Sequence, residues 1–223
     1  MNELIFVLQI GVLVGALFWA ARIGKEALIV LSVLLSVFAN FFVLKQMLLL
    51  GWNVTCSDAF AIGNIFGLNM LAQGYGRDAA KKTIWISFFA MVFYVVVSQI
   101  LLFFVPSPHD ISQVHFASLL ETAPRLLIAS LATFFIVQQF DVRLYGFFQM
   151  RLARFSWQTR STICLLISQA LDTVLFSLLG LYGIIQDLFS MMIVSYLVKC
   201  AVIVLTSIGA VFFNPLKKLS HEV

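Results

Sequence analysis

The chain has 223 residues, of which 62% are hydrophobic and 11% are charged, and its mean hydropathy is +1.04. This composition excludes a water-soluble domain, whose surface needs many more charged residues at this size. The net charge of +4 does not indicate nucleic-acid binding, because the basic residues are scattered between apolar segments. Cys56, Cys164 and Cys200 are odd in number and widely spaced, so the sequence predicts neither a disulfide framework nor a zinc site.

The hydropathy pattern predicts helices long enough to cross a membrane, all in one domain that spans residues 1–223. In chain order they lie at about 3–21, 27–50, 58–74, 83–105, 125–148, 161–184 and 188–213. The fold class is therefore an all-α membrane protein, a compact bundle of about six to seven helices. The first helix has no charge over residues 4–20 and is longer than the apolar part of a signal peptide, so we expect it to be retained.

The third predicted helix is the least regular, because glycines and amides interrupt its apolar residues. We expect a short, tilted or broken span whose polar groups are covered by protein or by a water-filled cavity. Asn69 and Gln73 lie one turn apart on it, and Asn64 precedes them. Amides in hydrocarbon serve helix association as readily as ligand binding, so both roles stay open, as they do for Asn40 in the second helix.

The ends of the predicted helices alternate in charge, and this alternation predicts their orientation. Basic residues follow the first, third, fifth and seventh helices: Arg22, Lys25, Arg77, Lys81, Lys82, Arg151, Arg154, Arg160, Lys217 and Lys218. The opposite ends carry Glu3, Asp58, Asp110, Glu121 and Asp187, with Arg125 as their one clear basic residue. Because basic loops stay in the cytoplasm, we expect the N-terminus and the loop at about 106–124 outside, and the C-terminus inside.

Asp141 lies in the segment FDVRLY (140–145), nearer the predicted cytoplasmic end of the fifth helix. Local pairing with Arg143 or Arg151 is one interpretation, and a functional role is the other. Lys45 is close enough to a helix end for its ammonium group to reach the interface, so we assign it no role.

Asp172 is the most informative residue, because it lies near the middle of the sixth predicted helix. An ionisable side chain near the bilayer centre costs at least about 2.5 kcal/mol, so it needs a partner or a function. Helical spacing places Gln169, Asp172, Thr173 and Phe176 on one face. This face offers an amide, a carboxylate, a hydroxyl and an aromatic ring, which together can bind a flat polar ligand.

In the seventh predicted helix, Tyr196 and Lys199 also share a face. Lys199 can bind the same ligand, or it can form an ion pair with Asp172 that only fixes the packing of the two helices. The residues themselves leave both possibilities open.

Five short segments of the chain are distinctive in combination: Gly63-Asn64-Ile65, YGRDAAKK (75–82), FDVRLY (140–145), STICLLISQALDTVLF (161–176) and SYLVK (195–199). Taken together, these segments resemble the queuosine precursor transporter family, a vitamin-uptake-like family of bacterial inner-membrane proteins. The resemblance covers most of the chain, from about residue 27 to residue 213.

The resemblance implies uptake of 7-deazaguanines such as preQ0, preQ1 or queuine for salvage into tRNA, in a bundle similar to the membrane components of vitamin importers. It also implies that Asp141, Gln169, Asp172 and Lys199 belong to the functional core. The chain departs from the family pattern at three positions. Asn69 and Gln73 stand where the family usually has Asp and Glu, and the segment 206–208 reads Thr-Ser-Ile where it often has Asp-Thr-Pro. Because fewer carboxylates would face a cationic precursor, a neutral deazaguanine or a bulkier base becomes correspondingly plausible as the ligand.

We therefore expect an alternating-access transporter of a planar, nucleobase-like solute, with no cofactor, in the bacterial inner membrane. Asp172 would accept hydrogen bonds from the guanine-like edge, with Gln169 beside it, and Phe176 or Tyr196 would stack on the ring. Lys199 would bind the oxo group or hold Asp172 ionised in the empty site.

Two other function classes compete with this expectation. An intramembrane aspartyl enzyme is disfavoured, because no GxGD motif surrounds Asp172 and Leu171 directly precedes it. A substrate-binding subunit that needs a separate energising partner stays possible, as does a homo-oligomer, because a docking surface leaves no clear mark in one sequence.

Overall fold

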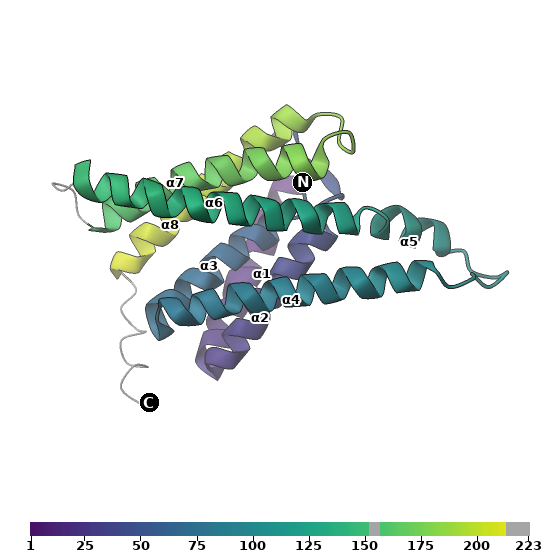
Figure 1. Ribbon diagram of the computed structural model, residues 1–223, viewed down its shortest axis with the longest axis horizontal. Coiled ribbons are helices and arrows are strands. Elements are labelled where there is room, and N and C mark those ends of the chain that lie inside the picture. The colour runs from purple at the N-terminus through teal and green to yellow at the C-terminus, as the bar shows by residue number, and fades with distance from the viewer. Residues whose placement is uncertain (152–156, 213–223) are drawn as a thin grey trace.

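The computed structural model describes residues 1–151 and 157–212 of the chain and shows a bundle of helices with one small hairpin (Figure 1). Its elements in chain order are α1 (Asn2–Ile23), α2 (Lys25–Phe41), β1 (Gln46–Leu49), β2 (Trp52–Thr55), α3 (Asp58–Tyr75), α4 (Arg77–Leu102), α5 (Gln113–Leu120), α6 (Ala123–Arg151), α7 (Trp157–Phe176), the π-helix η1 (Ser177–Leu181) and α8 (Leu188–Phe212). The predicted all-α membrane class is confirmed.

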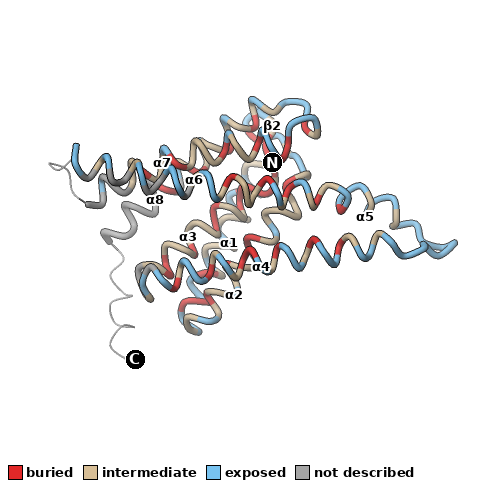
Figure 2. Tube along the Cα trace, in the orientation of Figure 1, coloured by how far each residue is buried: buried red, intermediate tan, exposed pale blue. Residues whose placement is uncertain are grey.

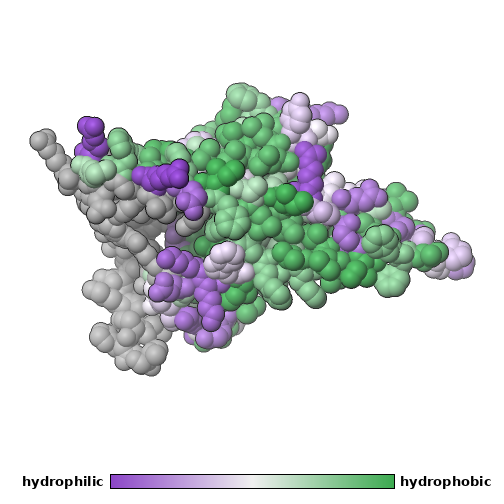
Figure 3. Space-filling model, in the orientation of Figure 1, coloured by the Kyte–Doolittle hydropathy of each residue, from purple (hydrophilic) through white to green (hydrophobic). Residues whose placement is uncertain are grey.

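Four segments of the described chain are helical, long and apolar enough to cross a membrane: Asn2–Ile23, Asp78–Leu102, Gln113–Val137 and Thr162–Leu181. Two shorter apolar helices, Asp58–Ala72 and Leu188–Ala201, accompany them. A broad apolar surface covers the middle of the molecule, and hydrophilic residues gather toward its two ends (Figure 3). This distribution is what a bilayer requires of a protein that crosses it.

The second predicted helix, at 27–50, differs from the structure, because α2 ends at Phe41 and the rest of that segment enters the hairpin. The strands β1 and β2 are antiparallel and are joined by Leu50 and Gly51, which have φ angles of 51° and 83°. Positive φ at both central residues is typical of the tight turns that connect two strands. Hydropathy did not predict this hairpin, because its first strand is as apolar as a helix.

The first helix holds the tip of this hairpin in place. The Asn2 side chain donates a hydrogen bond of 2.8 Å to the carbonyl of Leu48, and Glu3 accepts one of 3.1 Å from the amide of Leu50. The start of α1 and the hairpin turn therefore form one connected region.

The third helix is continuous from Asp58 to Tyr75, so its glycines do not break it. Two of them allow neighbouring helices to approach closely. A methyl group added at Gly67 would lie 2.5 Å from Ser32 Oγ on α2 and 3.0 Å from Leu17 Cδ2 on α1. Leucines on α1, α2 and α3 form the buried cluster around this contact. The irregular composition of α3 therefore serves tight packing in the middle of the bundle.

Other boundaries also differ from the predicted ones. The connection predicted between the helices at 58–74 and 83–105 is reduced to Gly76, whose φ of 88° separates α3 from α4, so α4 begins at Arg77 rather than at residue 83. The predicted helix at 161–184 becomes a π-helix at Ser177 and ends at Leu181, and the loop at 106–124 contains the short helix α5.

Helices α6 and α7 lie side by side, and α8 packs against α7 behind them (Figure 1). Buried residues lie on the faces that these helices and α3 turn toward the interior, whereas α5 and much of α4 are exposed (Figure 2). The bundle has two halves, one formed by α1 to α4 with the hairpin and the other by α6, α7, η1 and α8. Contacts between α8 and both α3 and β2 connect these two halves. The polar residues that α7 and α8 carry are thus brought beside the start of α3.

Candidate functional site

A cavity of about 180 Å³ lies inside the bundle, between α2, α3, α6, α7, η1 and α8. A cavity of about 150 Å³ already holds a benzene-sized molecule, so this one can take a small ring system. Its charged lining residues, within the described chain, are Asp58, Asp172 and Lys199, and Phe176 adds an aromatic ring. Hydroxyl groups line much of the rest, including those of Thr55, Ser130, Thr173, Ser177 and Ser195.

Asp172 and Lys199 meet at this cavity, as a ligand site or a packing pair would require. Lys199 Nζ lies 3.0 Å from Asp172 Oδ2 and 3.1 Å from the hydroxyl of Thr173, which in turn donates to the carbonyl of Gln169 at 2.9 Å. The Lys199 side chain is 11% exposed, but that of Asp172 keeps 31% of its surface open. Lys199 is therefore held firmly, and the carboxylate of Asp172 stays accessible from the cavity.

Asp58 is the charged residue of this cavity that sequence reasoning missed. It is the first residue of α3, is only 5% exposed, and accepts a hydrogen bond of 2.7 Å from the hydroxyl of Ser195 on α8. From the sequence alone, its charge is one of the acidic signals at the outer ends of the predicted helices. Ser195 precedes Lys199 by one helical turn, and this spacing is the sequence signal that could have pointed to a polar face on α8.

Asn40 on α2 also lines the cavity, and its hydrogen bonds explain its position. Its amide nitrogen donates to the carbonyl of Ser36 at 3.1 Å and lies 2.9 Å from Met91 Sδ on α4. Its oxygen accepts a hydrogen bond of 3.0 Å from Ser130 on α6. Asn40 therefore joins three helices, which is the packing role that its sequence position left open.

Of the other residues predicted for the site, Phe176 lines the cavity, whereas Gln169 and Tyr196 do not. The Gln169 carbonyl accepts the hydrogen bond of Thr173, and the Tyr196 hydroxyl donates to the carbonyl of Leu166 at 3.3 Å. The ring of Tyr196 is thus turned toward the backbone of α7.

The predicted polar residues of α3 lie apart from this cavity. Asn64 and Asn69 are partly buried but are not among the residues that line it, and Asn64 Oδ1 has no hydrogen-bond partner within the described residues. The side chains of Gln73 and Asp141 lie outside the described part of the structure.

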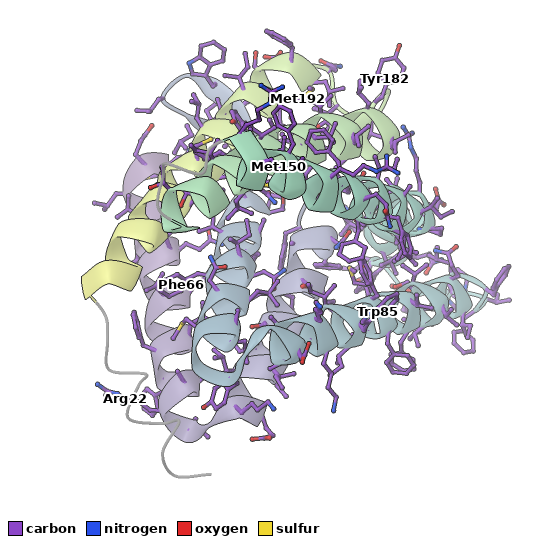
Figure 4. All side chains as sticks on the ribbon, turned by 60° about the vertical axis from the view of Figure 1, so that its left-hand side comes forward. Arg22, Phe66, Trp85, Met150, Tyr182 and Met192 are labelled. Carbon is purple, nitrogen blue, oxygen red and sulfur yellow. The ribbon has the colours of Figure 1, made fainter. Side chains whose placement is uncertain are left out.

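The π-helix η1 borders the cavity through Ser177 and Leu181. Arg125 on α6 holds its end, since its guanidinium donates one hydrogen bond of 3.1 Å to the carbonyl of Leu179 and a second to that of Tyr182. The side chain of Tyr182 points away from the bundle (Figure 4). A cation at the last carbonyls of a helix is favourable, which explains the one basic residue on an otherwise acidic side.

A membrane-embedded helical bundle with a small polar cavity is the architecture of proteins that bind small molecules within a bilayer. Residues 59–212 match the family described as "Putative vitamin uptake transporter". A relative from Bacillus subtilis (strain 168), described as "Probable queuosine precursor transporter", is 30% identical over 183 residues, which cover 80% of this chain and 80% of the relative. No solved structure gives a significant match.

The chain therefore belongs to the vitamin uptake transporter family. It is a multi-pass membrane protein of the transporter class rather than a member of an enzyme family. The family resemblance read from its sequence segments is confirmed.

Proposed function

We propose that this transporter imports a 7-deazaguanine precursor of queuosine, such as preQ0, preQ1 or queuine, across the bacterial inner membrane. The observation that carries the proposal is the accessible carboxylate of Asp172 beside Lys199, in a cavity of about 180 Å³. The printed description of the Bacillus subtilis relative supports the choice of ligand class.

The ligand would enter the site edge first. A deazaguanine presents adjacent N–H donors, which match the two oxygens of the Asp172 carboxylate, and an oxo group, which matches the ammonium of Lys199. Phe176, which lines the same cavity, would pack against the flat ring. In the empty site, the ammonium of Lys199 donates a hydrogen bond of 3.0 Å to Asp172 Oδ2 and so orients the carboxylate.

Gln169 and Tyr196 would join the site in another conformation of the transport cycle, because they lie on the same two helices as Asp172 and Lys199. Asp141, Asn64, Asn69 and Gln73 stay predicted functional residues, because polar groups within membrane spans need a partner or a role.

The orientation that we propose places the N-terminus outside and the C-terminus in the cytoplasm, as the basic loops indicate. The hairpin then lies on the outer side, where Thr55 at its end lines the cavity. In this arrangement the hairpin covers the cavity from outside, and transport requires the two halves of the bundle to move relative to each other.

Bacteria that can neither make nor take up the precursor provide a direct test. Producing this chain in them and supplying preQ0, preQ1 or queuine should restore queuosine in tRNA, and Asp172→Asn should abolish the effect at equal protein levels. Asp187→Asn removes an exposed carboxylate and is the matched control. Unchanged queuosine content with all three compounds would contradict the proposed ligand class.

A further inference from the structure

The ammonium group of Lys199 has two hydrogen-bond partners on α7, and they are neighbours in the sequence. It donates to Asp172 Oδ2 at 3.0 Å and to the hydroxyl of Thr173 at 3.1 Å. Asp58 attracts the same ammonium only through space, because no hydrogen bond joins the two in the described part of the chain. An ammonium group carries three N–H donors, so these contacts leave one donor for a further acceptor.

The hydroxyl of Thr173 is itself held in one orientation. It donates its proton to the carbonyl of Gln169 at 2.9 Å, so toward Lys199 it can only accept. Hydroxyl groups in helices often make this bond to the preceding turn, and Thr83 on α4 makes it to Ala79 at 2.8 Å. The backbone bond alone provides the hydroxyl proton with a partner. The bond to Lys199 is therefore additional, and the folding of α7 does not require it.

This additional bond lies at the wall of the cavity. Asp172, Thr173 and Lys199 all line the cavity, and the latter two are only 4% and 9% exposed. A lysine ammonium rotates freely at the end of a flexible stem, so two fixed acceptors limit the directions of its remaining N–H group. Without Thr173 the ammonium would be held by Asp172 alone, and its ordering by a ligand would reduce the affinity.

We propose that Thr173 is a positioning residue of the binding site, whose hydroxyl holds the ammonium of Lys199 so that its remaining N–H group binds the oxo group of the ligand. The inference rests on the proposed function and names the determinant of one ligand feature, the oxo acceptor. Thr173 acts through Lys199 and does not need to touch the ligand. A buried N–H group held in this way disfavours a base with a poor acceptor at the same place, because the donor would then stay unpaired.

Two probes that differ in a single atom test this positioning. preQ0 carries the oxo group, and its thioxo analogue keeps the N–H donors of the same edge but replaces the oxygen with sulfur, a weak acceptor. The same pair made from preQ1 is used if preQ1 binds more tightly. Equilibrium binding is measured on the purified full chain in lipid nanodiscs. The wild type should bind the oxo form about tenfold more tightly, the scale of one hydrogen bond to a charged group.

Thr173→Val removes the hydroxyl and keeps the branched shape of the side chain. It should weaken the oxo form by about fivefold or more and the thioxo form by less than about twofold, so the preference becomes smaller. Thr173→Ser keeps the hydroxyl and should keep the preference. Thr83→Val is the matched control, because it removes a buried hydroxyl with the same backbone bond away from the cavity, and it should leave the preference unchanged.

An equal loss of both forms in a folded Thr173→Val variant would overturn the inference, because a residue that serves only packing affects both forms alike. Thr173→Cys gives a second measurement if the valine variant does not fold. Its thiol is a poorer acceptor, so an unchanged preference in that variant would also overturn the inference. So would equal affinity of the wild type for the two forms. Binding of neither form of either base, nor of queuine, would instead refute the proposed function, and this inference with it.

Discussion

Replacement of Asp172 by asparagine should weaken both the packing of α7 against α8 and the binding of the ligand. The variant leaves the buried Lys199 with the hydroxyl of Thr173 at 3.1 Å and without the carboxylate of Asp172. Removing one partner of a fully buried ion pair costs about 3–5 kcal/mol. We expect a smaller loss here, about 2 kcal/mol in the free energy of unfolding. The Asp172 side chain is 31% exposed, and Lys199 still has the Thr173 hydroxyl as a hydrogen-bond partner.

Ligand binding should weaken as well, for a different reason. Asparagine replaces one acceptor oxygen with an NH₂ donor that opposes the donors of the deazaguanine edge. The expected loss is about 2 kcal/mol or more, which is roughly thirtyfold in Kd. Thermal unfolding in detergent measures the first effect, and equilibrium binding of a labelled deazaguanine measures the second.

The double variant Asp172→Asn/Lys199→Met distinguishes the two roles. It removes the unpaired ammonium, so stability should return toward that of the wild type while binding stays impaired. Normal uptake by the double variant would refute the reasoning, because the ion pair would then serve packing alone.

Three further predictions concern packing and orientation. Gly67→Ala should lower the free energy of unfolding by about 1–3 kcal/mol, because its methyl group would lie 2.5 Å from Ser32 Oγ. Gly11→Ala is the control and should cause no such loss, because nothing lies within 4 Å of its added methyl group. Equal melting temperatures of the two variants would contradict this prediction. Arg125→Ala should speed amide hydrogen exchange in η1. Arg125→Lys should not restore the protection, because an ammonium group cannot bind two carbonyls in the way that the planar guanidinium of arginine does. A reporter fused after Lys218 should be active only in the cytoplasm, and activity outside would reverse the proposed orientation.

The long helices could be predicted from the sequence because a bilayer demands about 20 apolar residues for each crossing. The hairpin at 46–55 could not, because Leu48, Leu49 and Leu50 are apolar in either conformation. The decisive feature there is the positive φ of Leu50 and Gly51, and a leucine carries no signal for it.

Part of the candidate site was also predictable. Asp172 stood out because a carboxylate in the middle of an apolar helix needs an explanation, and the same argument identified Lys199. Asp58 did not stand out, because an acidic residue at a helix end is ordinary in a loop facing water. Only the packing of α8 and β2 against the start of α3 shows that this end is buried.

Uptake by proteoliposomes that contain only this chain tests the central claim most directly. Radiolabelled preQ0, preQ1 and queuine are supplied outside, with guanine and an unrelated pyrimidine as comparison solutes and protein-free liposomes as the background. We expect saturable entry of at least one 7-deazaguanine, and loss of that entry in Asp172→Asn. Entry of none of the three, or entry of the comparison solutes at the same rate, would contradict it.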